Sequence, residues 1–464
     1  MMRPYYSIAA VFLMFLAGAA HASQNPGSDK SAKSGSSESE WGRPFAELQF
    51  SGVAGGSHES WRAGFDFALS GGRDGFEVSV IAPIRFDPDG FRMREWDEPN
   101  DFGRLLSRFG WTDRTGRFDV SIKPVQNFNL GMGNLVSMFN GVIDGDHFRT
   151  GVSARLHWDV AGGDLFLDGV AGPSVIGGRV YFRPLWFVDR SGQIGRLEIG
   201  ASFAGDINAP SNLGASTPEN PTSSVPGPNG LVATDPSPLT AWSIDVSWPV
   251  RPARAIQIKP WASWSRIGWS DASHVGLELA FNIRSKVVLT VTGRYDFMES
   301  GFVTGYFDNV YMADRYDFNA FRDAAEGPVS KRVVTGASRP ARHGGAFGMM
   351  AGWDPWLTAW IGADVDQYGA FSRIRAGLTV KVPDRLLLTG TVYARGFGVD
   401  GRQRLADRIF CSVAADVTVW KYIGVFALYS RDLFVPDSGS DRFRYVSGNT
   451  GLAGVRFSFG LLKD

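Results

Sequence analysis

The chain has 464 residues, of which 57 are Gly and 13% are aromatic. Its 47 basic and 47 acidic side chains cancel, so it lacks the excess of basic residues that a nucleic-acid partner would require. The single cysteine, Cys411, allows neither an internal disulfide framework nor a Cys/His metal pattern.

The N-terminus has the features of a secretory signal. Arg3 supplies positive charge, Ile8 to Ala20 is apolar, and Ala20-His21-Ala22 matches a cleavage site. We therefore expect a cleaved signal peptide over residues 1–22. A membrane anchor is the alternative, but the apolar stretch is short for a span. Residues 23–40, rich in Ser, Gly and charge, predict a disordered leader, and residues 41–464 predict one barrel domain.

Along the rest of the chain, segments with alternating apolar and polar residues are separated by irregular segments. In Trp242 to Val250, for example, Ile244 and Val246 share one face and Asp245 the other. The clearest alternating segments are residues 152–160, 195–204, 242–250, 273–284, 286–297, 372–382 and 409–420. Each predicts a β-strand with one apolar face.

Four irregular segments interrupt this pattern, at residues 86–115, 126–147, 207–237 and 298–340. The first predicts a short helix capped by Asn100 or Asp101, because Phe102, Leu105, Leu106 and Phe109 fall at helical spacing. The helix could plug a lumen, pack on a rim or lie beside the sheet.

The length of the alternating segments indicates the fold class. They run for ~9–13 residues, whereas ordinary strands have about 5–6 and a strand that crosses a bilayer needs ~9–11. We therefore predict an all-β chain that forms a transmembrane antiparallel β-barrel. At ~16 residues per strand and connection it would have about 16–18 strands. A secreted soluble sandwich or propeller is the alternative.

Aromatic residues near the predicted strand ends are typical of the girdles of outer-membrane barrels, although β-propensity also enriches them in strands. The pairs are Trp264 and Trp269, Tyr295 and Phe297, Trp353 and Trp356, Tyr393 and Phe397, and Trp420 and Tyr422.

The polar faces of the predicted strands carry many charges. A charged side chain at mid-bilayer costs ~2–4 kcal/mol, which fixes the register so that these charges face inward. The candidate lumen-lining residues are Arg155, Asp159, Arg179, Arg183, Glu198, Asp245, Lys259, Glu278, Arg284, Arg294, Asp296, Asp364, Arg373, Arg375, Lys381 and Asp416. They predict a hydrated pore of mixed sign, or alternatively ion pairs that fill a closed lumen.

Few residues suggest catalysis or metal binding. Asp144-Gly145-Asp146-His147 could hold a cation, but Asp-Gly-Asp is also common in turns. His157 and Asp159 share a face, as the two members of an acid/base pair would, but no nucleophile is recognisable beside them. We predict no enzyme, no cofactor and no metal site.

The chain resembles porin-type outer-membrane barrels over about 41–460. The stretch from Asp101 to Leu185 also resembles a group of outer-membrane barrels without an assigned activity. The resemblance rests on Phe128-Asn129-Leu130-Gly131-Met132-Gly133, on Asp146-His147-Phe148-Arg149, and on Gly178-Arg179-Val180-Tyr181-Phe182-Arg183-Pro184-Leu185. At the C-terminus, Val455, Phe457 and Phe459 resemble the closing strand that the barrel assembly machinery recognises, although the chain does not end on an aromatic residue.

These observations predict a protein of the Gram-negative outer membrane, and the resemblance implies the same location. Its expected function is that of a passive or weakly selective channel for small polar solutes or ions. A plugged structural or adhesive barrel is the alternative, followed by a rim-sited hydrolase. The expected partners are outer-membrane lipid and the assembly machinery, without nucleic acid, and the sequence does not indicate an oligomeric state.

Overall fold

The computed structural model describes residues 45–56, 61–73, 75–87, 90–91, 96, 101–141, 149–190, 192–211, 213–215, 225–226, 231–233, 236–283, 286–317, 330–332, 340–367, 372–383, 385–395, 409–420, 422–434 and 446–460. The predicted signal peptide and leader, the Asp144–His147 motif, Arg284 and Phe397 lie outside these residues.

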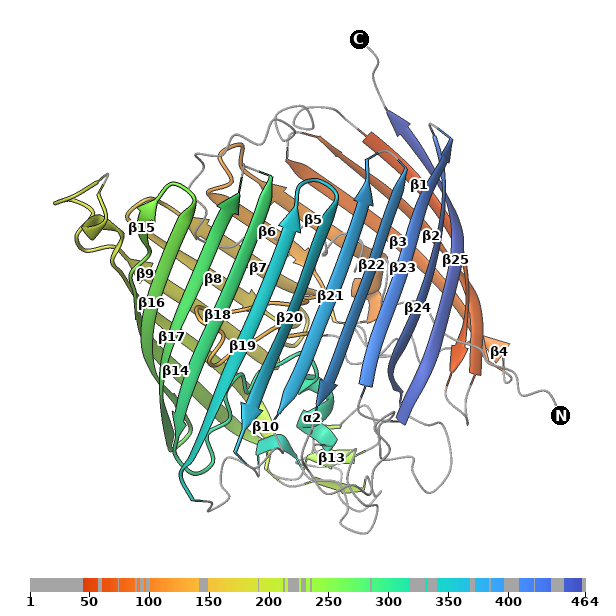
Figure 1. The fold of residues 1–464 in the computed structure, drawn as a ribbon. Helices are drawn as coiled ribbons and strands as arrows, with labels where there is room; N and C mark the ends of the chain where they lie inside the picture. Colours follow the sequence, from red (N-terminus) through yellow and green to blue (C-terminus); the bar gives the residue numbers. More distant parts are fainter. Residues whose placement is uncertain are drawn as a thin grey trace.

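Most strands of the chain belong to one antiparallel sheet that closes on itself (Figure 1). The sheet contains 22 strand segments. Two of them, β4 (Gly90–Phe91) and β15 (Val250–Ala253), are short additions, so the closed barrel has 20 strands. The first strand, β1 (Phe45–Gly56), pairs in full register with the last, β25 (Val446–Gly460). The barrel therefore has no free sheet edge at this seam.

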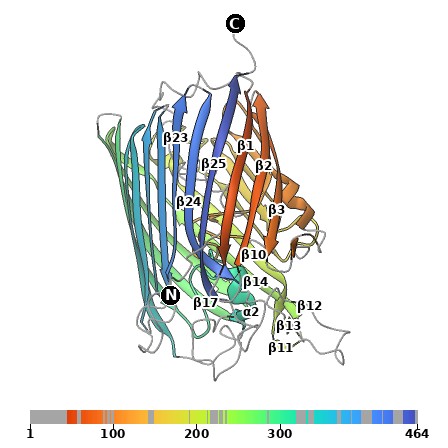
Figure 2. The same cartoon turned by 90° about the vertical axis from the view of Figure 1, so that its right-hand side faces the viewer.

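Each remaining strand lies beside the next one in the chain (Figures 1 and 2). They are β2 (Trp61–Arg73), β3 (Phe76–Asp87), β5 (Leu106–Thr112), β6 (Phe118–Lys123), β7 (Gly151–His157), β8 (Ala161–Leu167), β9 (Val175–Phe182), β10 (Glu198–Pro210), β14 (Pro236–Ser247), β16 (Ile256–Ile267), β17 (Ser270–Ile283), β18 (Val287–Met298), β19 (Arg342–Trp353), β20 (Leu357–Asp366), β21 (Arg373–Val382), β22 (Leu386–Arg395), β23 (Ile409–Trp420) and β24 (Ile423–Phe434).

The count of 20 exceeds the predicted 16–18. Residues 86–115, counted as irregular in the prediction, contain all of β5, and β5 to β9 have only 6–8 residues each. The allowance of ~16 residues per strand and connection was therefore too large for this part of the chain.

The predicted alternation is clear on strands such as β9, β10 and β14. On β14, the side chain of Ile244 is 50% exposed, whereas Asp245 is 3% exposed. On β21, Ile374 and Leu378 are exposed while Arg373 is buried. The outer face of the barrel is therefore apolar and its inner face polar, which is the reverse of a soluble barrel.

The two edges of the barrel differ. At one, here called the short-turn edge, most connections are turns of a few residues, and β1 begins and β25 ends there. The other, here called the long-connection edge, is where β3, β6, β10, β18, β22 and β24 end, and the longer connections of the chain begin there. Helix α2 (Tyr311–Asp317) and the small sheet β11 (Leu213–Ala215), β12 (Val225–Pro226) and β13 (Leu231–Ala233) lie at this edge (Figures 1 and 2).

The helix predicted around Phe102 is wrong in extent. Asp101–Leu105 forms a 3-10 turn, η2, and Leu106 and Phe109 belong to strand β5. A second 3-10 turn, η3, covers Ile194–Arg196. Pairing with β3 decides the conformation at Leu106, since a few residues at helical spacing cannot outweigh a full ladder of backbone hydrogen bonds. No helix within the described residues is long and apolar enough to span a membrane.

Candidate functional site

Two segments from the long-connection edge fold into the barrel and touch each other. We call residues 124–141 and 299–317 together the constriction. Val136 and Phe307 form a parallel β-bridge. Ser137 donates its N–H to Phe307 O at 3.0 Å, and Gly305 donates to Asn134 O at 2.7 Å. The backbone of each segment thus satisfies polar groups of the other.

The constriction has an apolar centre. The rings of Phe128 and Phe139 lie 4.8 and 5.1 Å from that of Phe166 on β8, and Phe307 packs against Tyr311 at 4.8 Å. These side chains are almost fully buried. They join wall residues of β8 to β10 and β14 to β18 in one continuous cluster, so the constriction is a packed element rather than a loose loop.

One wall cluster lies on β9, β10 and β14. The guanidinium Nη2 of Arg179 is 3.0 Å from Glu198 and 2.8 Å from Asp245, and Arg183 lies 3.4 Å from Glu198. Gly131 of the constriction has φ +55°, and a Cβ there would stand 3.0 Å from Arg179 Nε. Glycine therefore permits the chain to pass this close to the cluster.

A second wall cluster is centred on Asp364 of β20. Its carboxylate is 2.9 Å from Arg294 Nη2, 3.4 Å from Arg373 Nε and 3.4 Å from Arg375 Nη2. Asp296 adds a contact of 2.8 Å to Arg294. This cluster stands on β18, β20 and β21.

The second wall cluster also holds the constriction. Arg373 donates to the carbonyl oxygens of Gly305 and Thr304 at 3.1 and 3.0 Å. Arg375 donates to Ser137 Oγ at 2.9 Å. On β16, Ser263 accepts a hydrogen bond from Asn134 Nδ2 at 2.5 Å. The constriction is thus fixed to several strands of the wall, and arginine suits this task because its donors diverge in a rigid plane.

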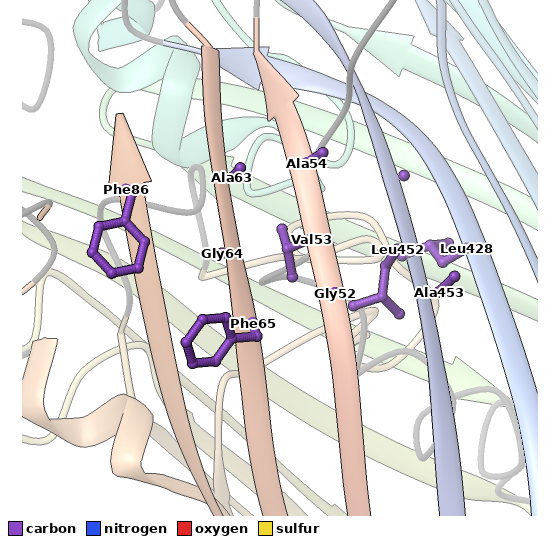
Figure 3. Close-up of a pocket in the computed structure, with 11 residues that line it drawn as sticks. Gly52, Val53, Ala54, Ala63, Gly64, Phe65, Phe86, Leu428, Leu452 and Ala453 are labelled. Atoms are coloured by element: carbon purple, nitrogen blue, oxygen red, sulfur yellow. The ribbon is translucent and has the colours of Figure 1, made fainter. Parts of the chain in front are cut away.

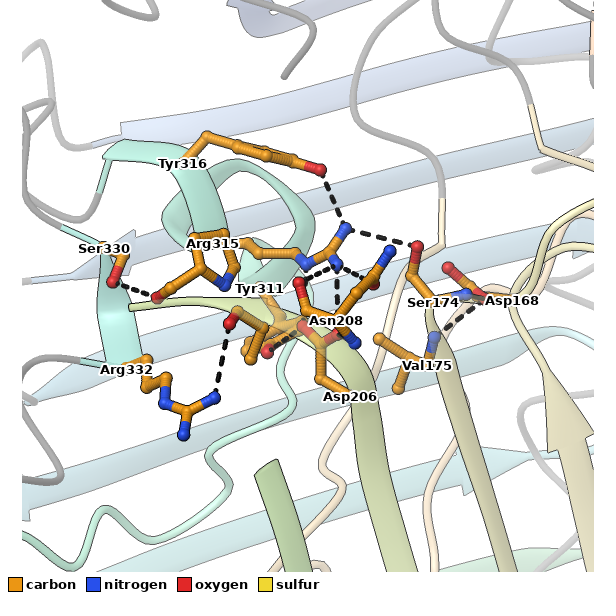
Figure 4. Close-up of polar contacts among 12 residues, drawn as sticks. Asp168, Ser174, Val175, Asp206, Asn208, Tyr311, Arg315, Tyr316, Ser330 and Arg332 are labelled. Carbon is orange, nitrogen blue, oxygen red and sulfur yellow. Dashed lines mark hydrogen bonds and ion pairs between the residues drawn. The ribbon is translucent and has the colours of Figure 1, made fainter. Parts of the chain in front are cut away.

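Helix α2 is anchored to β10 by a buried bidentate ion pair (Figure 4). Arg315 Nε and Nη2 donate to the two carboxylate oxygens of Asp206 at 2.7 and 3.0 Å. Arg315 also donates to Ser174 Oγ and Asn208 O, and Tyr311 donates its hydroxyl to Asp206 at 2.7 Å. Asp206 and Arg315 are each 1% exposed, so removal of either one would leave a buried, uncompensated charge.

Two further aspartates in this region have opposite pKa shifts. Burial favours the neutral acid at Asp308, but Lys331 at 3.3 Å and Arg373 at 3.1 Å outweigh it and lower its pKa. At Asp314, burial prevails over its contacts with Arg395 and Lys331, and the pKa is raised. The carboxylate at Asp308 is therefore stabilised by folding, and that at Asp314 is not.

The other candidate lumen residues lie in several different settings. Arg155 on β7 is 39% exposed and stacks over the Phe128 ring. Asp159 lies in the turn after β7, exposed and paired with Arg117 at 3.2 Å. Lys259 and Glu278 are opposite each other on β16 and β17. Lys381 is exposed at the end of β21, and Asp416 on β23 pairs with Arg456 at 2.5 Å.

Sequence reasoning missed several of the charges that hold the constriction. Asp206 continues the inward face of β10 from Glu198, so alternation could have identified it, but it lies between the predicted alternating segment 195–204 and the irregular segment 207–237. Asp308, Asp314 and Arg315 lie where no period exists. Only the fold brings them to the wall.

The candidate acid/base pair does not form. His157 Nδ1 lies 3.1 Å from the hydroxyl of Tyr181, and its Nε2 lies 3.7 Å from Asp164, whereas Asp159 pairs with Arg117. Within the residues that the structure describes, no three potential ligands gather at a metal site.

A hollow of about 770 Å³ lies along the seam of β1, β2, β24 and β25 (Figure 3). Small residues such as Gly52, Ala54 and Ala453 line it, with the rings of Phe65 and Phe86 at one side. None of the described residues that line it is charged, so the hollow is not suited to a polar solute.

Exposed aromatic residues follow the short-turn edge on the outer face. Trp353, Trp356, Trp420 and Tyr422 of the predicted girdle lie there. Tyr393 is an incorrect member of the predicted set, because its side chain is buried on the opposite face from exposed Val392. The alternation along β22 places the Tyr393 side chain on the inner face. Its position near a strand end did not show which face of the sheet the side chain takes.

The comparisons with known proteins gave matches only among solved structures. No family model matches the chain, and no curated protein matches it. A ferric enterobactin receptor of Pseudomonas aeruginosa, crystallised with enterobactin, matches with a TM-score of 0.37 and 12% identity, covering 90% of this chain and 82% of its own.

OccK11 (OpdR) of Pseudomonas aeruginosa matches with a TM-score of 0.33 and 11% identity, covering 91% of this chain and 98% of its own. OccAB4 of Acinetobacter baumannii matches with a TM-score of 0.34 and 8% identity, covering 90% of this chain and 98% of its own. These matching structures are outer-membrane barrels. The present chain is an all-β, closed antiparallel barrel of 20 strands whose interior holds a packed constriction.

Proposed function

We propose that this protein is a passive, weakly selective channel of the outer membrane for small polar solutes. The main support for this proposal is the reversed polarity of the closed sheet, which has apolar side chains outside and charged side chains inside. Such a surface is stable only where hydrocarbon surrounds the barrel and water or polar groups fill it. The short-turn edge would face the periplasm, as in other such barrels.

The charged residues of the inner face would line the path of the solute. Arg155, Arg183, Arg375 and Arg456 project from the inner face yet keep part of their side chains exposed. In a 20-stranded barrel the wall side chains alone cannot fill the interior. Water beside the constriction accounts for the partial exposure of these arginines, and their carboxylate partners keep the walls mixed in sign.

A plugged barrel is the second candidate, and the packed apolar centre of the constriction favours it. In that case the same ion pairs would only hold the plug, and function would reside in the long connections. Outer-membrane lipid and the assembly machinery, which would receive β25, are proposed partners in both cases.

Planar-bilayer conductance of the purified full chain tests the proposal, after heat-modifiable gel migration has shown that the barrel is folded. Steady steps of uniform size would support a constricted channel. A heat-modifiable protein that inserts but conducts nothing would contradict it in favour of the plugged barrel.

A further inference from the structure

The barrel wall is not of even height. The five consecutive strands β5 to β9, here called the low wall, have 6–8 residues each, whereas the flanking β3 and β10 have 12 and 13. The pairing shows where the difference lies. β3 pairs with β5 only from Phe76 to Val80, and β9 pairs with β10 only as far as Asp206. The low wall therefore stops short at the long-connection edge.

The height of the low wall can be compared with the bilayer. A strand of about 7 residues, at roughly 3.3 Å per residue and a tilt near 40°, rises roughly 18 Å, whereas the apolar band of an outer-membrane barrel is about 25 Å tall. A strand of about 12 residues rises roughly 30 Å on the same basis. The top of the low wall would thus lie below the outer boundary of the hydrocarbon.

Several residues exposed at the top of the low wall are apolar. Between β8 and β9, Val170 is 58% exposed, and Ala171 and Pro173 are also exposed. Turn η2, which precedes β5, exposes Phe102 and Leu105. In water these apolar groups would be unfavourably placed, but in hydrocarbon they are stable.

The polar groups of the same turn are satisfied from within. Asp168 accepts the N–H groups of Ser174 and Val175 at 2.8 and 2.9 Å, and Val170 donates its N–H to Thr150 O at 2.8 Å. Arg149 donates to Asp168, to Gly172 O and to Ser174 Oγ. A turn that lies in lipid requires such internal partners, because lipid offers none.

Strands β16 to β19, here called the tall wall, have 12–14 residues each and differ from the low wall at the same edge. Their outer face there carries the Arg266–Asp271 ion pair, with contacts of 2.6 and 2.7 Å, and the Tyr295–His343 hydrogen bond of 2.7 Å. Trp269, in the turn between β16 and β17, is 94% exposed. Polar and amphipathic groups of this kind belong at a membrane–water interface.

We infer that the rim of the low wall, formed by η2 and residues 168–174, is embedded in the outer leaflet and binds lipid acyl chains, whereas the rim of the tall wall lies at the membrane–water interface and is open to water. This inference rests on the proposed membrane location. The outer rim of the barrel is then asymmetric relative to the membrane. Arg315 of α2 donates to Asp206 and to Ser174, so the helix is anchored next to the turn that lipid would cover (Figure 4).

Depth-dependent quenching tests the inference. In a Cys411→Ser background, single cysteines replace Val170, Trp269 and Ile244 in the full chain, and each carries an environment-sensitive fluorophore. The folded proteins are placed in phosphatidylcholine vesicles with or without doxyl-labelled acyl chains. Ala171→Cys provides a second position if Val170→Cys does not fold.

The label at residue 170 or 171 should be quenched at least twofold by acyl-chain doxyl and shielded from aqueous iodide, whereas the label at 269 should behave in the opposite way. If iodide quenches the labels at residues 170 and 269 equally, and acyl-chain doxyl still quenches the label at residue 244, the inference is overturned although the barrel lies in the membrane. If 244 is also unquenched by doxyl lipid, the proposed membrane location itself fails.

Discussion

Individual charges decide how firmly the constriction is held. Asp308 and Asp314 are only a few residues apart, and both contact Lys331. Their surroundings nevertheless differ, because Arg373 and Lys331 overcome the burial of Asp308 while burial dominates at Asp314. A lowered pKa means that folding stabilises the carboxylate, and a raised pKa means that folding disfavours it.

The matched variants Asp308→Asn and Asp314→Asn test this difference. At pH 7 we expect Asp308→Asn to lower stability by about 3–5 kcal/mol, as when one partner of a buried pair is lost, and Asp314→Asn to cost less. The contribution of Asp308 is present above its unfolded pKa of about 3.9 and is lost as pH falls through its lower folded value. That of Asp314 is present at low pH and lost as pH rises through its raised pKa.

Tryptophan-fluorescence melting of the detergent-folded protein at pH 7 and pH 3 measures both effects. The difference in melting temperature between the two variants should be larger at pH 7 than at pH 3. An equal difference in melting temperature at both pH values would contradict the opposite pKa shifts of Asp308 and Asp314.

A glycine allows Arg373 to approach the constriction. Gly305 has φ +60°, and a Cβ there would lie 2.7 Å from Arg373 Nη2. We expect Gly305→Ala to cost about 1–2 kcal/mol from the backbone alone, to displace the guanidinium and to make the conductance noisier. Gly293→Ala is the control, because nothing lies within 4 Å of a Cβ at that exposed strand position. If both variants give the same current trace, Arg373 does not hold the constriction.

At the scale of elements, the constriction is stabilised by its contacts with the wall. A helix as short as α2 is unstable in isolation. Its position depends on Arg315 and Tyr311, which both bind Asp206 on β10. The strands of the barrel do not depend on α2 in the same way, because their ladders continue from β1 through to β25.

Arg315→Met should therefore release α2 without dissolving the barrel. The change leaves Asp206 buried without its bidentate partner, which costs about 3–5 kcal/mol. We expect normal heat-modifiable migration but a larger and less steady single-channel conductance.

Arg266→Met is the matched control, since Arg266 pairs with Asp271 on the outer face, away from the constriction. Its conductance should equal that of the unmodified protein. An Arg315→Met channel with unchanged conductance would show that α2 does not narrow the path.

At the scale of the whole molecule, the balance of charge limits selectivity. The chain has 47 basic and 47 acidic side chains, and both wall clusters combine arginines with carboxylates in nearly equal number. A path lined in this way offers no strong field of one sign.

We therefore expect a reversal potential close to zero in a KCl gradient across the bilayer. Removing charge of one sign should shift the reversal potential. Asp245→Asn removes one carboxylate partner of Arg179, so we expect the variant channel to become more selective for anions. A strongly cation- or anion-selective unmodified channel would instead mean that the conducting path bypasses the two wall clusters.

The sequence by itself determined the sheet and its polarity. Period-2 alternation over long segments, as in Trp242 to Val250, is a local property, and it correctly predicted an all-β barrel with Ile244 outside and Asp245 inside. It erred where local spacing competes with pairing, as at Leu106, and where strands are short, as in the low wall.

Only the tertiary structure decided what occupies the interior. Residues 124–141 and 299–317 have no period, and their positions depend on partners far away in the chain, such as Asp206 for Arg315 and Arg375 for Ser137. Likewise, the uneven height of the wall follows from which strands pair and for how long. Alternation reports which face a residue takes, because the backbone imposes it on every strand. Contacts between distant segments have no such local rule, and they appear only once the barrel closes.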